Sequence, residues 1–150
     1  MAKYFTPYEF IRSETAKRLN IDNTPNEKQM DNIIEVMRIM DKIREKWTEY
    51  CTLNYLPNPQ IIITSGFRSE ALNLAVKGSK TSQHKKGSAV DFKAKNGQNK
   101  ALFEVILKML ESGEIKVRQL IWEKGDDNNP AWIHLGNYEE GKQENQILRL

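Results

Sequence analysis

The sequence predicts an α+β fold in which a small antiparallel sheet carries flanking helices. Two observations support this class: helical periodicity dominates the first third of the chain, and short links join the strand-like runs near the C-terminus. A chain of 150 residues has the usual length of one domain, so we expect a single domain over residues 1–150. Its content of 39% apolar and 29% charged residues is ordinary for a soluble protein.

Two capping signals predict the helices of the first third. Thr6, Pro7 and Glu9 have the spacing of a helix start with a capping box, so we expect a short helix that runs to about Arg18. The signal recurs at residues 24–27 (Thr-Pro-Asn-Glu) and opens the longest helix of the chain. One face of that helix is marked, at helical spacing, by Ile33, Val36, Met37, Met40, Ile43, Arg44 and Trp47. This stripe predicts a helix that faces the core.

The rest of the chain alternates strands and helices. Apolar runs that are rich in β-branched residues or alternate with polar ones predict strands over residues 60–65, 89–92, 117–122 and 131–135, with a last edge strand over 146–150. Helical spacing predicts a short helix over 69–76 and a longer one over 99–112, each followed by a glycine. The polar segment between Gly78 and Gly87 is expected to form a loop.

Charge and cysteine content exclude several classes of protein. The net charge of +3 is spread along the chain, so we expect no nucleic-acid partner. The single cysteine, Cys51, excludes an internal disulfide and agrees with a reducing compartment. No apolar stretch approaches about 18 residues, so we expect no membrane span. The first residues contain no apolar signal segment, which predicts a cytoplasmic protein unless lysis or a virion carries it out.

The only two histidines, His84 and His134, are both placed to meet a carboxylate. Strand alternation puts Asp91 on the face opposite its apolar neighbours, and it does the same for His134. If the apolar residues face the core, Asp91 and His134 leave it on one side, within ligand range on adjacent antiparallel strands. Gly87 allows the chain to fold back, so that His84 can complete the set.

Two imidazoles and one carboxylate with an open fourth position are the ligand set of a catalytic zinc site. Zinc in such a site lowers the pKa of a bound water to about 7, which generates a nucleophile at neutral pH. The alternative interpretation is a capping aspartate and two histidines that hold no metal.

Three segments carry a resemblance to a known family. Residues 82–91 (Ser-Gln-His-Lys-Lys-Gly-Ser-Ala-Val-Asp) resemble the S-x-H-x-x-G-x-A-x-D motif of the M15 family of zinc D-Ala-D-Ala peptidases. Residues 132–134 (Trp-Ile-His) are similar to its W-x-H metal motif, and residues 63–69 resemble its S-G-[FY]-R-S segment. The opening residues 5–16 look like the start of the subgroup often found in phage genomes. The family includes D-alanyl-D-alanine carboxypeptidases, D-Ala-D-Ala dipeptidases and phage endolysins.

The resemblance implies the Hedgehog/DD-peptidase fold, with Zn2+ in a cleft on His84, Asp91 and His134. It implies a zinc-dependent peptidase, a D,D-carboxypeptidase or an endopeptidase, that hydrolyses peptidoglycan stem peptides. The implied partners are peptidoglycan peptides; we expect a monomer that acts on the cell wall after release or as a phage product. The resemblance also gives Arg68 a role, because the matching arginine stabilises the developing oxyanion or holds a substrate carbonyl.

The sequence departs from the family pattern at the position of the acid that should take a proton from the attacking water. In many relatives it lies three positions before the second histidine, where this chain has Ala131. Similar segments in the phage-type subgroup make Glu123 the first candidate for this base, although alternation leaves its facing ambiguous. Asp126 and Asp127 in the following loop are second. Ala131 also motivates a rival hypothesis, a non-catalytic phage structural or wall-binding module that keeps zinc for stability.

Overall fold

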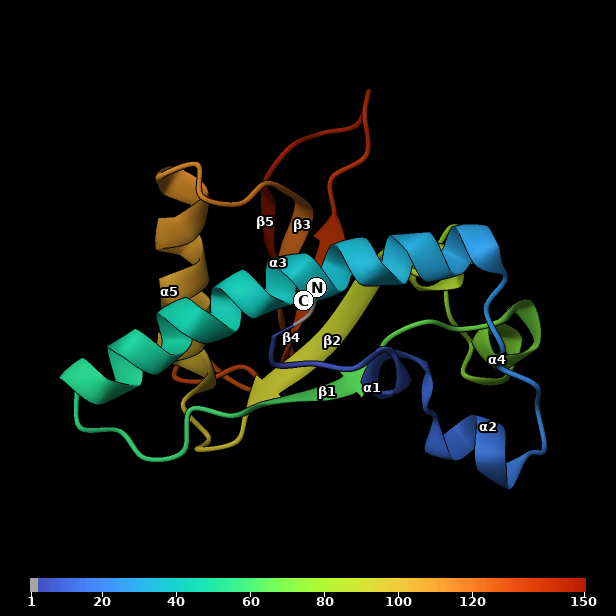
Figure 1. Ribbon diagram of the computed structural model, residues 1–150, viewed down its shortest axis with the longest axis horizontal. Helices are drawn as coiled ribbons and strands as arrows, with labels where there is room; N and C mark the ends of the chain where they lie inside the picture. The colour runs from blue at the N-terminus through green and yellow to red at the C-terminus, as the bar shows by residue number, and fades with distance from the viewer. Residues whose placement is uncertain (1–2) are drawn as a thin grey trace.

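The structure, a computed structural model, describes residues 3–150. In chain order (Figure 1) the elements are α1 (Pro7–Ile11), α2 (Glu14–Arg18), α3 (Glu27–Leu53), β1 (Ile61–Ser65), α4 (Glu70–Ala75), the 3₁₀ helix η1 (Gln83–Lys86), β2 (Ala89–Ala94), α5 (Asn99–Glu111), β3 (Val117–Glu123), β4 (Trp132–Asn137) and β5 (Gln146–Arg149). The predicted α+β class is confirmed, and each predicted strand is present.

The strands form one sheet in the order β1-β2-β4-β3-β5. The pairs β1/β2, β2/β4 and β4/β3 are antiparallel. For β3 and β4, which a short loop joins, the short link predicts this pairing. The last strand, β5, lies at the sheet edge as predicted, but it pairs with β3 and runs parallel to it. The chain after β4 therefore passes to the far side of β3.

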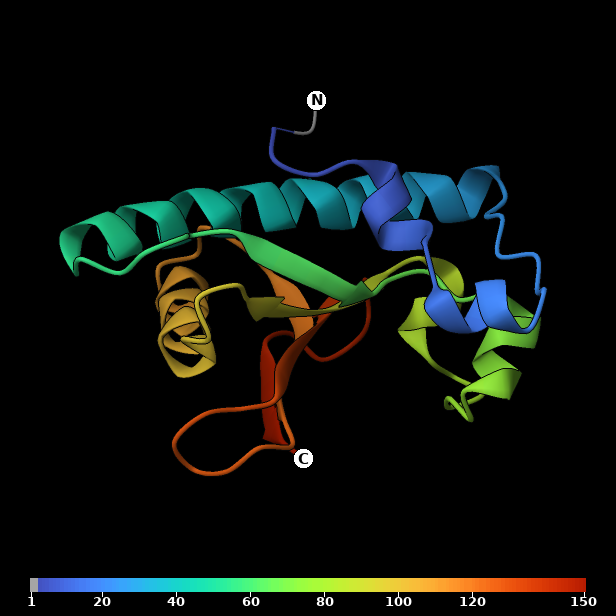
Figure 2. The same cartoon turned by 90° about the horizontal axis from the view of Figure 1, so that it is seen from below.

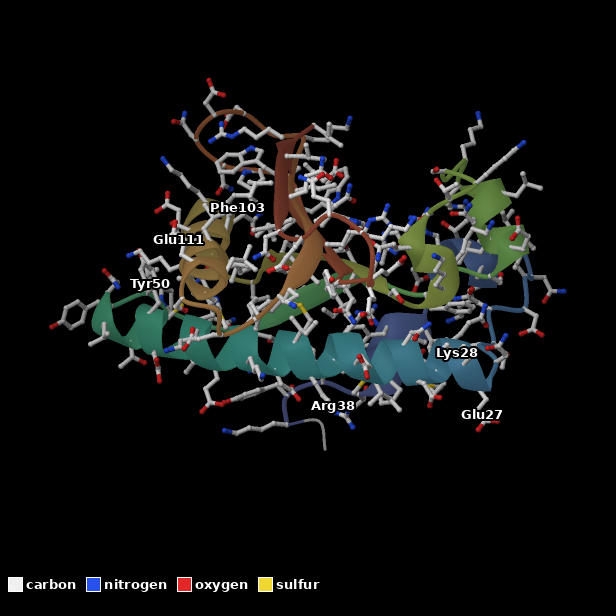
Figure 3. The ribbon with its side chains drawn as sticks, turned by 90° about the horizontal axis from the view of Figure 1, so that it is seen from above. Glu27, Lys28, Arg38, Tyr50, Phe103 and Glu111 are labelled. Carbon is white, nitrogen blue, oxygen red and sulfur yellow. The ribbon has the colours of Figure 1, made fainter. Side chains whose placement is uncertain are left out.

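The long helices α3 and α5 cover one face of the sheet; the opposite face, called the free face below, lies away from them (Figure 2). The long helix α3 crosses the sheet, and α1, α2 and α4 gather around the end of it that lies far from α5 (Figures 1 and 2). Figure 3 shows Glu27 and Lys28 at the start of α3 and Tyr50 near its other end, on the side where α5 carries Phe103 and Glu111. Among residues 3–150, no helix has the length and apolar character needed to cross a membrane.

The core lies between α3, α5 and the covered face of the sheet. The predicted stripe of α3 is buried except at Arg44, whose Nε donates to the Pro59 carbonyl (2.7 Å). Trp47 is fully buried, and Phe103 of α5 packs edge-on against Trp122 of β3. Each large apolar side chain buried in this way contributes about 1.5–3 kcal/mol, so burial holds the sheet and its free face in a fixed shape.

The first predicted helix is two helices. At Arg12 the backbone turns to an extended conformation (ψ 142°), which ends α1. Ser13 then starts α2, because its Oγ accepts a hydrogen bond from the backbone N–H of Ala16 (3.1 Å). Serine competes for backbone donors in this way, and the competition favours a cap over a helix interior. The break directs residues 12–15 toward the free side of the sheet.

The cap of α3 also differs from the prediction. The N-cap is Asn26, whose Oδ1 accepts from the Gln29 N–H, while Gln29 Oε1 accepts from the Asn26 N–H (both 2.8 Å). Thr24, the expected cap, instead bonds to the Asp22 carboxylate. The capping box is therefore present, two residues later than the threonine and proline suggest.

A buried carboxylate on α3 fastens the N-terminal segment. Asp41 is 9% exposed, and its two oxygens accept hydrogen bonds from the backbone N–H groups of Lys3 (2.8 Å) and Tyr4 (2.9 Å). The next residue, Phe5, packs against Phe10 of α1. The tie between Asp41 and the N-terminal segment therefore helps to place α1, and with it the helix break at Arg12.

We expect Asp41→Ala to lower the free energy of unfolding by about 1–3 kcal/mol, because two partly buried backbone donors lose their charged acceptor. Urea unfolding followed by circular dichroism measures the change. Asp31→Ala, which removes an exposed carboxylate from the same helix, is the matched control and should stay within about 0.5 kcal/mol of the parent. An equal loss of stability in both variants would contradict a stabilising role for the hydrogen bonds between Asp41 and the N-terminal segment.

Candidate metal centre

The register of β2 against β4 brings two of the three predicted ligands together. Asp91 of β2 pairs directly with His134 of β4, and cross-strand partners project from the same face of a sheet. Their neighbours Val90, Phe92 and Ile133 are fully buried on the helix-covered face. Asp91 and His134 therefore lie on the free face, as alternation predicts.

The third residue, His84, reaches this face from η1. The segment turns at Gly87, which has a left-handed backbone (φ 80°) and lies so close to α3 that a Cβ would stand 2.6 Å from the Gln29 carbonyl oxygen. Glycine is the residue that tolerates both constraints. Ser82 begins η1 by accepting a hydrogen bond from the His84 N–H (3.2 Å), so it supports the loop.

Hydrogen bonds fix the rings around the carboxylate. His84 Nδ1 lies 2.7 Å from the Gly66 carbonyl oxygen and must donate to it, which leaves Nε2 as the free lone pair. That Nε2 is 3.4 Å from Asp91 Oδ2, and His134 Nδ1 is 2.8 Å from Asp91 Oδ1. A carbonyl behind a histidine is the usual way in which a protein orients a metal ligand.

The centre carries a stable negative charge. Burial raises the pKa of the Asp91 carboxyl, but hydrogen bonds and charge interactions with His134 and His84 outweigh burial and hold that pKa well below its ordinary value. The side chains are only 3% (His84), 16% (Asp91) and 14% (His134) exposed. An anion of this kind, with two imidazoles around it and little water, is electrostatically suited to a cation.

The three residues fit a metal ion. One ligand atom from each of His84, Asp91 and His134 lies within 4.8 Å of the other two. Two imidazole nitrogens and one carboxylate oxygen form a set that zinc accepts in catalytic sites.

Arg68 lies beside this centre. Its backbone N–H donates to the His84 carbonyl (3.0 Å), and its Nε is buried without a hydrogen-bond partner among residues 3–150. Burial lowers the pKa of the guanidinium, while the Asp91 charge opposes that shift. A Cβ on Gly78 would stand 2.7 Å from Arg68 Nη1 and 2.1 Å from Asn73 Oδ1. The guanidinium is therefore packed over a position that admits no side chain.

A cleft of about 360 Å³ opens next to the centre. Its lining comes from the helix break at residues 12–15, from residues 64–68 at the end of β1, from Asp91, and from Leu72 and Val76. Arg68 and Asp91 thus line one cavity together with apolar side chains, and a concave site with a few charged groups among apolar ones is typical of ligand binding.

Glu123 lies on the same face of the sheet as the candidate ligands. Its register partner on β4 is Trp132, and Ile121 pairs with His134. Glu123 and His134 are therefore diagonal neighbours on one face, which resolves the ambiguity that alternation leaves. Ala131 is exposed, and its N–H donates to the Glu123 carbonyl (3.0 Å), so the two positions adjoin.

The two aspartates of the following loop lie elsewhere. Asp126 Oδ1 accepts from the N–H groups of Asn128 (2.8 Å) and Asn129 (3.0 Å), and the Asp126 carbonyl accepts from Trp122 Nε1. Asp127 is fully exposed, 3.7 Å from Arg149. Since Trp122 projects from the covered face, this loop folds away from His134.

Several residues that lie near the site were not singled out from the sequence. Arg12 and Ser13 reach the cleft only because of the helix break, which a Ser-x-x-Ala spacing could have suggested. Buried Asn73 donates to the Ser79 carbonyl (3.0 Å) and packs beside Arg68. Buried Gln83 donates to the Asn137 carbonyl (2.9 Å), which ties η1 to β4.

The fold and the site define an α+β protein with a candidate metal centre of the kind that metal-dependent hydrolases use. The family described as Peptidase M15 matches residues 3–136, and the chain belongs to this family. Membership implies a metallopeptidase with a peptide substrate. A search of curated proteins found no significant match.

Zinc added to the metal-free protein should raise the melting temperature, because a ligand bound only by the folded state at 1,000 times its Kd stabilises it by about 4 kcal/mol. For a chain of this size we expect a shift on the order of 10 °C in differential scanning fluorimetry. Asp91→Asn should remove most of the shift, whereas Asp127→Asn, an exposed control, should keep it. A full shift in Asp91→Asn would place the metal elsewhere.

Proposed function

We propose that this protein is a zinc metallopeptidase that hydrolyses a peptide bond in peptidoglycan stem peptides. The observation that carries the proposal is the convergence of His84, Asp91 and His134 beside a cleft that Arg68 also lines, in a chain of the peptidase M15 family. The resemblance of residues 82–91 to the D-Ala-D-Ala peptidase motif supports a cell-wall peptide as the substrate.

In this proposal His84 Nε2, an Asp91 oxygen and His134 Nδ1 hold the zinc ion. Zinc with two imidazoles and one carboxylate supplies Lewis acidity, which polarises a peptide carbonyl and acidifies water. His84 keeps its orientation through the hydrogen bond to the Gly66 carbonyl, so the metal-facing nitrogen is set before a metal arrives.

Arg68 stabilises the oxygen of the scissile carbonyl as negative charge develops on it. The guanidinium is held by packing over Gly78, and its side chain faces the cleft that contains Asp91. A planar, permanently charged donor in a water-poor cleft stabilises such charge more than it would in water.

Glu123 acts as the base that takes the proton from water. Support comes from the register, which puts Glu123 diagonal to His134 on the free face, and diagonal positions lie roughly 7–8 Å apart, within reach of a long side chain and a water. Asp126 and Asp127 are less suited, because their loop folds toward Trp122 on the covered face.

Ala131 supports one rival, a non-catalytic module in which zinc only stabilises the fold of a phage structural or wall-binding protein. The two hypotheses differ in turnover, because only the enzyme hydrolyses a peptide and only the enzyme needs a base near the metal. Mass spectrometry of peptidoglycan digested by the zinc-loaded protein tests both, and it also identifies the bond that is cut. Intact peptidoglycan across a pH series, with zinc bound, would favour the rival.

Glu123→Gln should lower kcat by about 10²–10⁴ while zinc stays bound, because the amide keeps the shape of the side chain but cannot accept a proton. Release of peptide from purified peptidoglycan measures the rate, and the zinc-dependent melting shift verifies the metal. Glu104→Gln, on the exposed side of α5, is the matched control and should keep full activity. Unchanged turnover in Glu123→Gln would assign the proton transfer to another group.

Arg68→Lys should lower kcat by about 10², because the charge stays but the planar fork of donors is lost. Steady-state kinetics on a soluble stem peptide separates kcat from KM. Arg38→Lys on the exposed face of α3 is the control. A rise in KM alone, with kcat unchanged, would show that Arg68 only binds substrate.

A further inference from the structure

One wall of the cleft that Arg68 lines has no role in the proposed chemistry. It consists of residues 12–15, which the break between α1 and α2 directs into the cavity. Within this wall Ser13 is committed to capping α2, since its Oγ accepts from the Ala16 N–H. Arg12 is the residue of the wall that brings a positive charge to the cleft.

The position of Arg12 is fixed by the edge of the sheet. Its Nη2 donates to the Ile63 carbonyl of β1 (3.2 Å), which holds the guanidinium beside the strand that ends at the cleft. One of five N–H donors is used in this bond, so the others are available. Within residues 3–150, Arg12 makes no ion pair, whereas Arg118 and Arg149 each lie within 3.7 Å of a carboxylate.

Two guanidinium groups at the cleft can bind an anionic group. Arg12 and Arg68 line it together with Glu14 and Asp91; Arg12 and Glu14 are both exposed, whereas the Asp91 carboxylate is bonded to His134 in the metal centre. A carboxylate suits a guanidinium best, because two parallel N–H donors match its two oxygens. Stem peptides of peptidoglycan carry free carboxylates, among them those at the terminal D-Ala and at the α-carbon of D-Glu.

We propose that Arg12 is a specificity-determining residue that binds a free carboxylate of the substrate peptide in the cleft beside Asp91. The protein then acts on peptides that carry this carboxylate near the bond to be cut and discriminates against amidated peptides. This inference rests on the proposed function. It concerns recognition alone, since Arg68 and Glu123 remain responsible for turnover.

Two matched pairs of peptides distinguish the two sources of the carboxylate. The first pair is N-acetyl-L-Lys–D-Ala–D-Ala and its C-terminal amide. The second is L-Ala–D-Glu–L-Lys, in which D-Glu is linked to L-Lys through its γ-carboxyl, and the same peptide with the D-Glu α-carboxylate amidated. For each peptide, KM and kcat are measured with the zinc-loaded protein, and Kd is measured with the zinc-free protein by NMR titration. The Kd does not depend on catalysis.

In one of the two pairs we expect the acid to bind at least about tenfold more tightly than the amide, as a charge-assisted hydrogen bond predicts. Arg12→Gln should reduce this preference to less than about threefold by raising KM and Kd for the acid, with kcat changed little. Arg12→Lys should retain part of the preference. Arg18→Gln, an exposed arginine at the end of α2, is the matched control and should leave it unchanged.

The outcomes separate this inference from the proposed function. Turnover without discrimination in either pair, or discrimination that survives Arg12→Gln, overturns the carboxylate site and leaves the peptidase standing. Discrimination in Kd that Arg12→Gln removes, without any turnover, overturns the peptidase and supports the carboxylate site. Failure of all four peptides to bind overturns both.

Discussion

The pairing of Asp91 with His134 across β2 and β4 is the constraint on which the rest of the site depends. Side chains alternate between the faces of a sheet, so a slip of one residue between these strands would send one of the two ligands into the core. The fully buried side chains of Val90, Phe92 and Ile133 exclude such a slip, because it would expose them. The apolar face thereby sets the geometry of the polar face.

The position of His84 depends on the same sheet through its neighbours. The Gly66 carbonyl that orients the ring follows directly after β1, and β1 pairs with β2 so that Ser65 lies opposite Asp91. Gln83 ties η1 to the end of β4, and Gly87 lets η1 approach α3. The segments β1, β4 and α3, which are far apart in sequence, thus all contact η1 or its histidine. These contacts explain how a short 3₁₀ helix can hold the His84 side chain with little freedom of movement.

Strand alternation and periodicity were enough to predict the class, the strands and the face of Asp91 and His134, because those properties follow from local patterns. The prediction of one helix up to about Arg18 and the prediction of a cap at Thr24 were wrong in detail. Several Ser, Thr and Asn side chains near each helix start compete for the same backbone donors, so the sequence does not show which one forms the cap. The facing of Glu123 depends on its register with Trp132, and the packing of Asn73 against Arg68 depends on α4, so neither follows from a local pattern.

Register also explains how the family pattern can lose an acid at Ala131 without loss of the metal ligands. The N–H of Ala131 bonds to the carbonyl of Glu123, so the two positions adjoin at the ends of neighbouring strands, on the side of the site away from β1. Glu123 approaches the centre from that side, since it shares the face of His134. In the proposed function, β3 therefore supplies the base in place of the segment that precedes β4. In the proposed function, metal binding depends on β2, β4 and η1 and proton transfer on β3, so the two can change independently.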